Sequence, residues 1–228
     1  MSVAENLAAI LDSIHAVASE CGNDKVELVA VSKLKPVSML KEAFEAGQRL
    51  FGENYVQEML EKAAEVPEAQ FRFIGHLQSG KAKQVVQPKN VIAIDTVDSL
   101  KLAKKLDNAC SAIGRTIGVM LQVNTSGEES KSGVAPADAK QFYEDVKAQC
   151  SHLNIEGFMT IGSPEDSLKP EPEAFRVLAG IRDSVDPTLA LSMGMSSDYE
   201  AAIRMGTSYV RVGSAIFGAR PFAGSVPK

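Results

Sequence analysis

The chain has 228 residues, of which 45% are hydrophobic, and its formal net charge is −5 at pH 7. This is enough apolar material for one full-sized core and rather little for two, so we expect a single domain over residues 1–228. The acidic balance argues against a nucleic-acid or membrane partner, because either normally needs a clustered basic face, and it favours a small ligand instead.

The first predicted element is an amphipathic helix over residues 2–21. Apolar side chains recur at helical spacing between Val3 and Val17, and residues 22–24, Gly-Asn-Asp, are typical of a helix end. The segment has neither the basic region nor the small-residue cleavage site of a secretory signal, and no stretch of the chain approaches the roughly 18 uninterrupted apolar residues of a membrane span. We therefore expect a cytoplasmic protein.

After this helix, short apolar runs alternate with segments of helical periodicity. Eight runs are candidate strands: residues 26–32, 49–52, 71–75, 91–95, 116–123, 155–161, 189–193 and 209–212. The run at 91–95 has the weakest strand pattern. Strand-helix alternation implies a parallel sheet, and eight units in roughly 200 residues fit a closed (β/α)8 TIM barrel. We prefer the barrel to a doubly wound open sheet because the eighth strand completes the count and no GxGxxG motif follows the first strand.

Lys33 terminates the first apolar run and is the first candidate for chemistry. The continuous run 28–31 reads as a buried strand, and Pro36 can open the helix that follows. A lysine at that place presents its amine at the mouth of an α/β core, where desolvation lowers its pKa. An amine of this kind can form a Schiff base.

The carboxyl ends of all barrel strands open on one face, so polar residues that follow the strands should meet there. Such residues follow most of the predicted strands: Lys33, Glu53, Asn54, His76, Asn124, Thr160, Ser196, Arg211, Gly213 and Ser214. Asn54 and His76 are either hydrogen-bonding partners near a ligand or simple strand-end caps. The cysteines Cys21, Cys110 and Cys150 have no metal-ligand spacing and read as free thiols.

The loops after the seventh and eighth strands are candidates for holding a phosphate group. Each contains a glycine and a serine, Gly194 with Ser196 and Gly213 with Ser214, which can offer backbone amides and hydroxyl donors. Residues 197–200 have the S-x-x-E form of a capping box, which predicts a helix N-terminus facing the same mouth, with Gly206 at the helix end. Alternatively, the glycines only make tight turns.

Arg211 lies within an apolar strand, so its guanidinium must be paired or must face a ligand. The pairing alternative is a salt bridge to Glu53 or another carboxylate. Other basic residues (Lys35, Lys81, Lys83 and Lys131) are expected in solvent, although Lys131 could reach an incoming phosphate.

Six blocks in the same order, residues 30–36, 51–57, 73–79, 131–133, 191–196 and 210–218, together resemble the pyridoxal 5'-phosphate (PLP) homeostasis protein family. The resemblance spans nearly the whole chain and implies a single barrel of the alanine-racemase N-terminal type. It further implies an internal aldimine of PLP at Lys33, phosphate held around Ser196, Gly213 and Ser214, and Arg211 near the pyridine nitrogen. Asn54 also belongs to the expected cofactor site.

Two residues depart from the family pattern, Arg72 in place of a histidine and Gly80 in place of an asparagine, and we expect them to alter local loop contacts more than cofactor binding. At a PLP ring nitrogen, an always-charged guanidinium would keep that nitrogen unprotonated and make the ring a poor electron sink.

Two functions then compete, a carrier that buffers or delivers PLP without turnover and a PLP-dependent amino-acid racemase. A two-base racemase needs an acid or base on each face of the substrate, and Lys33 supplies only one. Alanine racemases add a β domain, whereas this chain ends about ten residues after Gly218. The four tyrosines are Tyr55, Tyr143, Tyr199 and Tyr209, of which only Tyr55 and Tyr199 are expected near the mouth. We predict a monomeric carrier and expect PLP-dependent apo-enzymes among its recipients.

Overall fold

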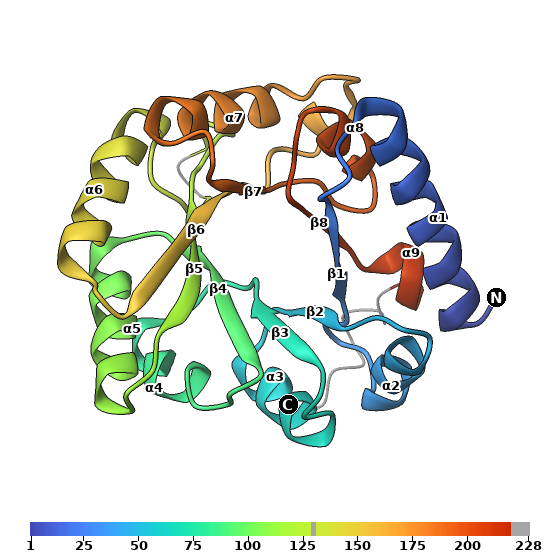
Figure 1. Ribbon diagram of the computed structural model, residues 1–228, viewed down its shortest axis with the longest axis horizontal. Coiled ribbons are helices and arrows are strands. Elements are labelled where there is room, and N and C mark those ends of the chain that lie inside the picture. The colour runs from blue at the N-terminus through green and yellow to red at the C-terminus, as the bar shows by residue number, and fades with distance from the viewer. Residues whose placement is uncertain (129–130, 220–228) are drawn as a thin grey trace.

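The computed structural model describes residues 1–128 and 131–219, and within them the predicted barrel is confirmed (Figure 1). Eight parallel strands follow one another in sequence order around the barrel, and β1 pairs with β8 to close it. The strands are β1 (Glu27–Val31), β2 (Leu50–Glu53), β3 (Gln70–Phe73), β4 (Val91–Val97), β5 (Ile117–Gln122), β6 (Leu153–Met159), β7 (Ala190–Ser192) and β8 (Tyr209–Val212).

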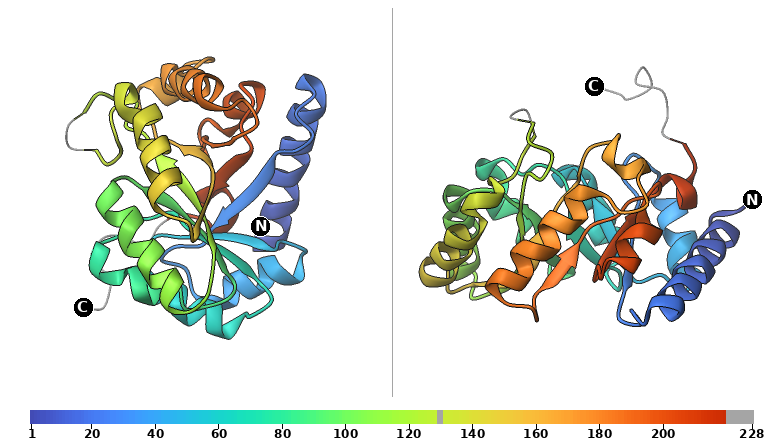
Figure 2. Two further views of the ribbon diagram at one scale, coloured as in Figure 1. Left: turned by 60° about the vertical axis from the view of Figure 1, so that its left-hand side comes forward. Right: turned by 90° about the horizontal axis from the view of Figure 1, so that it is seen from above.

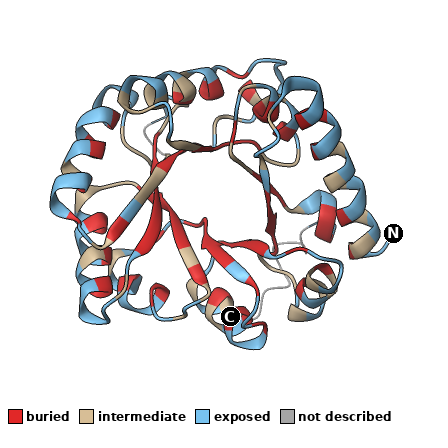
Figure 3. Ribbon diagram, viewed as in Figure 1, coloured by how far each residue is buried: buried red, intermediate tan, exposed pale blue. Residues whose placement is uncertain are grey.

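The helices form a ring outside the strands, with their inner faces buried and their outer faces in solvent (Figures 1 and 3). They are α1 (Val3–Cys21), α2 (Val37–Glu45), α3 (Val56–Glu65), α4 (Ala82–Val85), α5 (Leu100–Ala112), α6 (Ala139–Gln149), α7 (Glu173–Val185), α8 (Tyr199–Arg204) and α9 (Ser214–Phe217). No helix in the described ranges is long and apolar enough to cross a bilayer.

The leading helix α1 has clear start and stop signals. The Ser2 hydroxyl accepts from the Glu5 amide at 3.1 Å, and the Glu5 carboxylate accepts from the Ser2 amide at 2.7 Å, which is a capping box. Gly22 ends the helix in the left-handed region, with a φ of 72°. Figures 1 and 2 show α1 packed beside α8 and α9, so the first and last helices of the ring lie side by side.

The strand predictions differ from the structure mainly at their ends. The run with the weakest pattern, predicted over 91–95, is β4 and reaches Val97, whereas β3 ends at Phe73 and leaves Ile74 and Gly75 in the following loop. Gly75 lies so near the second loop that a Cβ there would be 2.0 Å from the Asn54 carbonyl oxygen. This close approach, rather than a strand, accounts for the glycine.

Charged side chains from several strands meet inside the barrel. Arg72 of β3 donates from Nε to both Asp95 oxygens of β4, at 3.0 and 2.9 Å, and from Nη2 to Glu156 of β6 at 2.6 Å. Its guanidinium also lies 4.2 Å from the ring centroid of Tyr209 on β8. A residue that reaches three other strands must point into the barrel. The expectation that Arg72 alters loop contacts was therefore wrong, because it completes a buried ion network below the mouth.

Candidate functional site

A cavity of about 520 Å³ opens at the carboxyl ends of the strands, and we call it the Lys33 cavity. Its volume lies in the range typical of sites for small molecules. The structure brings together in its lining all of the residues predicted for the cofactor site: Lys33, Asn54, Ser196, Arg211, Gly213 and Ser214. Apolar side chains from the same strand ends complete the wall: Val31, Ile74, Met159, Ile161 and Met195.

Lys33 follows the buried end of β1 and is partly exposed. The chain turns immediately after it, with Leu34 in the left-handed region at a φ of 58°. Pro36 then serves as the N-cap residue of α2, in agreement with the sequence analysis. The buried strand and the turn together place Lys33 at the rim of the core.

Arg211 is only 4% exposed and is held by uncharged acceptors. Nη1 donates to the Ser192 hydroxyl and Nη2 to the Thr160 carbonyl, each at 2.8 Å. Burial lowers the pKa of Arg211, while the carboxylates of Asp95 and Asp198 oppose that shift. The predicted alternative of a salt bridge to Glu53 is wrong, because Glu53 is paired elsewhere.

The partner of Glu53 is Lys62 of α3, at 2.7 Å, and this pair was missed from the sequence. Both side chains are buried, at 0% and 2% exposure. Burial raises the pKa of Glu53 to about 7, although the Lys62 charge acts in the opposite direction. A carboxylate at a strand end, followed by a lysine on the next helix, was the only signal that could have indicated the pair.

Ser196, Gly213 and Ser214 form one wall of the Lys33 cavity. The Ser196 hydroxyl accepts from the Gly213 amide, and it receives a hydrogen bond from the Ser214 hydroxyl, each at 3.4 Å. A Cβ on Gly213 would lie 3.0 Å from the Val31 carbonyl oxygen, so β8 approaches β1 closely here. The amide and hydroxyl donors of this wall make it suitable for an anion.

Gly194 has a different role from the one predicted. Its φ is 93°, and a Cβ there would lie 2.5 Å from the Ala202 side chain of α8. The glycine therefore allows a turn and close packing of α8, which is the alternative stated for it, and it does not line the Lys33 cavity.

The predicted capping box at residues 197–200 was also wrong. Helix α8 begins at Tyr199 with Asp198 as its N-cap residue, and the Asp198 carboxylate accepts from the Met195 amide at 2.6 Å. Burial raises the pKa of Asp198. The buried aspartate thus fixes the loop that carries Ser196. Gly206 follows the last helical turn with a φ of 85°, as expected near a helix end.

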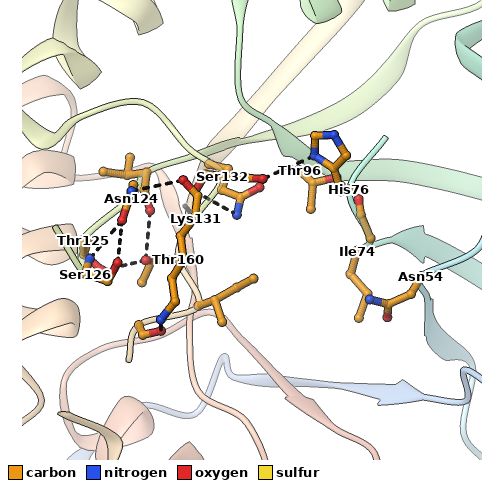
Figure 4. Close-up of a pocket in the computed structure, with 15 residues that line it drawn as sticks. Asn54, Ile74, His76, Thr96, Asn124, Thr125, Ser126, Lys131, Ser132 and Thr160 are labelled. Carbon is orange, nitrogen blue, oxygen red and sulfur yellow. Dashed lines mark hydrogen bonds between the residues drawn. The ribbon is translucent and has the colours of Figure 1, made fainter. Parts of the chain in front are cut away.

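Asn54 lies between the Lys33 cavity and a smaller neighbouring cavity of about 220 Å³, which we call the Lys131 cavity (Figure 4). Its side-chain Oδ1 is buried and has no hydrogen-bond partner among the described residues. A buried amide oxygen in such a position can accept a hydrogen bond from a ligand. Asn54 is therefore better placed for a ligand than for a strand-end cap.

His76 and Lys131 line the Lys131 cavity and not the Lys33 cavity. Figure 4 shows Lys131 beside Asn124 and Ser126, with His76 on the opposite side. Lys131 donates to the Gly162 carbonyl at 3.3 Å and pairs with Glu128 at 3.0 Å, so it is less solvated than predicted.

Of the remaining lysines, Lys81 and Lys83 are exposed as predicted. Lys35 instead donates to the Ala219 carbonyl at 2.6 Å and lines the Lys33 cavity.

This barrel, with a lysine after β1 and an anion-suited wall after β7 and β8, corresponds to a defined class. Residues 6–221 match the family described as alanine racemase, N-terminal domain. The pyridoxal phosphate homeostasis protein of Schizosaccharomyces pombe is 45% identical over 218 residues, which cover 92% of each chain. The chain belongs to the pyridoxal phosphate homeostasis protein family.

Two solved structures place the fold in context. PipY of Synechococcus elongatus PCC7942, solved with PLP bound, is 33% identical with a TM-score of 0.79 over 95% of this chain and 100% of that one. An alanine racemase of Clostridium difficile 630 has a TM-score of 0.72 at 17% identity and is matched over only 58% of its length. The second comparison shows a shared fold alone.

Proposed function

We propose that this protein binds PLP covalently at Lys33 and buffers or delivers it without catalytic turnover, as part of vitamin B6 homeostasis. The observation that carries the proposal is the Lys33 cavity, in which a lysine, an anion-suited wall and an unpartnered acceptor line one space. The names of the relatives and the PLP bound in PipY support the same ligand.

The groups of the Lys33 cavity match the groups of PLP. The Gly213 amide and the hydroxyls of Ser196 and Ser214 would hold the phosphate, and Asn54 Oδ1 would accept from the ring hydroxyl. The Lys33 amine is the group that would hold the cofactor as a Schiff base, with water as the leaving group. PLP supplies the aldehyde, and the chain supplies the nucleophile and the orienting contacts.

Arg211 affects how well the ring of bound PLP can withdraw electrons. A guanidinium has five N–H donors and no acceptor, so after its bonds to Ser192 and Thr160 it can still donate to an unprotonated ring nitrogen. An unprotonated ring withdraws electrons weakly and therefore stabilises carbanions poorly. This favours holding PLP over amino-acid chemistry.

The positions of the tyrosines give further support for a carrier over a racemase. No tyrosine is among the residues that line the Lys33 cavity in the described part of the chain. The Tyr199 hydroxyl forms a hydrogen bond of 2.8 Å with the Ser13 hydroxyl of α1. Tyr55 is half exposed at the start of α3. A racemase needs a second acid or base at the substrate, and neither tyrosine is placed for that role.

The proposal includes a cytoplasmic location, a monomeric state and transfer of PLP to PLP-dependent apo-enzymes. The net charge of −5 supports an acidic surface without affinity for nucleic acid or anionic membranes. Size-exclusion chromatography with light scattering tests the monomer, and a dimer mass would contradict it.

Equilibrium dialysis with PLP, followed by a racemase assay of the loaded protein, tests the function itself. We expect stoichiometric PLP uptake and no exchange of the α-proton of added amino acids. An appreciable racemisation rate that Tyr55→Phe or Tyr199→Phe abolishes would establish the enzyme instead. No PLP uptake at all would refute both functions.

A further inference from the structure

The two peptide groups on either side of the Lys33 Cα atom are both held by side chains of α3. On one side, the Ser32 carbonyl accepts from Lys62 Nζ at 2.6 Å. On the other side, the Leu34 amide donates to Glu58 Oε1 at 2.7 Å. These two peptide planes define the backbone angles of Lys33, so α3 fixes the direction in which the lysine side chain leaves the backbone.

The turn that follows Lys33 is strained and needs such support. Leu34 is the one non-glycine residue with a positive φ in the described ranges, at 58°. That conformation is unfavourable for an ordinary side chain, and it persists only where the surroundings impose it. The Glu58 carboxylate supplies a charge-assisted acceptor for the amide of this same residue.

Glu58 is itself fixed by a buried cation. Its Oε1 lies 2.6 Å from Lys62 Nζ, one helical turn further along α3, and Lys62 also contacts Glu53 at 2.7 Å. Lys62 is 2% exposed, so water competes little for these bonds and they are stronger than a surface pair. The Ser32 hydroxyl donates to the same Glu53 oxygen, which ties the end of β1 to the cluster.

We propose that Glu58 and Lys62 are positioning residues that hold the Lys33 turn in the one backbone conformation from which the amine reaches the aldehyde of PLP. The inference rests on the proposed function, since it concerns the approach of Lys33 to that carbonyl group. Neither residue lines the Lys33 cavity, so each acts through the backbone of residues 32–34. A lysine held near its attack position reacts faster than one that samples many orientations.

The test compares rates of adduct formation on Lys33 in matched variants. Each protein is mixed with PLP, the rise of visible Schiff-base absorbance is followed by stopped flow, and the adduct is fixed with borohydride and assigned by peptide mass spectrometry. Glu58→Ala removes the acceptor of the Leu34 amide. Glu61→Ala, an exposed residue on the same helix, is the control.

We expect Glu58→Ala to slow adduct formation roughly tenfold, the equivalent of one charge-assisted hydrogen bond, and Glu61→Ala to leave the rate unchanged. The double variant Glu58→Ala/Leu34→Gly should recover most of the rate, because glycine adopts a positive φ without strain. A general loss of folding would not be repaired by a glycine at residue 34, so the rescue separates positioning from stability.

If Glu58→Ala proves too unstable to purify, Glu58→Gln replaces it in the same rate measurements. Its neutral oxygen holds the turn less firmly, so the rate should fall about threefold and return with Leu34→Gly.

The inference would be overturned if Glu58→Ala, Glu61→Ala and the wild type reacted at equal rates. It would also be overturned if the double variant were no faster than Glu58→Ala. Either result would leave the proposed function intact. A wild-type protein that forms no adduct on Lys33 would instead refute the proposed function, and the inference with it.

Discussion

Arg211 and Ser192 are joined inside the barrel by a hydrogen bond of 2.8 Å from Nη1 to the serine hydroxyl. The bond links β8 to β7, and a second one of the same length links Arg211 to the Thr160 carbonyl beyond β6. The guanidinium is therefore held from β7 and from the end of β6 while it lines the Lys33 cavity. Its orientation toward a ligand is set before any ligand arrives.

Replacement of Arg211 by methionine tests this arrangement. The variant retains much of the apolar length but removes every donor, so we expect PLP retention to weaken by about three- to tenfold. The unfolding free energy should also fall by roughly 1–3 kcal/mol, because the Thr160 carbonyl and the Ser192 hydroxyl lose their donor. Equilibrium dialysis and urea unfolding measure the two effects. Unchanged retention with reduced stability would limit Arg211 to a structural role.

Ser196→Ala tests the anion-suited wall. The hydroxyl that contacts Gly213 and Ser214 is lost, so the affinity for PLP should fall several-fold, whereas the affinity for pyridoxal, which lacks the phosphate, should not change. Ser184→Ala on α7 is the control, because its hydroxyl is exposed and donates to the Ile181 carbonyl of its own helix. Equal weakening for both ligands would show that Ser196 does not face the phosphate.

Glu53 gives stability a predictable pH dependence. Burial raises its pKa in the folded protein from 4.5 to about 7, so between these values the folded state keeps a proton that the unfolded chain releases. This stabilising contribution is complete below about pH 4.5 and is lost as the pH rises through about 7, and it amounts to at most about 3 kcal/mol.

Glu53→Gln lacks that titration. Its unfolding free energy, relative to the wild type, should therefore rise between about pH 5 and about pH 8 in urea unfolding experiments. A constant or falling difference across that interval would contradict the raised pKa.

Gly75→Ala tests the contact that sets the position of Asn54. The new Cβ would lie 2.0 Å from the Asn54 carbonyl oxygen, so the second loop must move, and we expect a loss of about 2 kcal/mol or more together with weaker PLP binding. Gly80→Ala is the matched control, because its Cβ would meet nothing within 4 Å. A Gly75→Ala protein as stable as the control would show that the loop is free to adjust.

The sequence predicted the elements whose signals are local. Alternating apolar runs indicated the barrel. The polar residues at the ends of those runs indicated six residues that line the Lys33 cavity, since parallel strands bring their carboxyl ends together, but Lys35 was expected in solvent and also lines it. The S-x-x-E pattern of residues 197–200 predicted a capping box with Ser197 as the N-cap, but α8 begins at Tyr199 with Asp198 as its N-cap residue. The buried Asp198 carboxylate accepts from the Met195 amide, and a contact of this kind is not visible in the pattern.

Interactions between distant residues were not predictable in this way. Arg72 and Glu156 are 84 residues apart, and their pairing depends on which side chains point into the closed barrel. Lys62 was not singled out by the sequence, yet its amine is buried and donates to the Ser32 carbonyl beside Lys33. Register and packing determine such pairs, and neither is visible in one sequence.

Borohydride reduction of the PLP-loaded protein, followed by peptide mass mapping, tests the central claim most directly. We expect a single reduced pyridoxyl adduct on the peptide that contains Lys33, and no adduct and no visible absorbance band in Lys33→Ala. An adduct on Lys35 or another lysine, or a visible band that survives in Lys33→Ala, would contradict the assignment of Lys33.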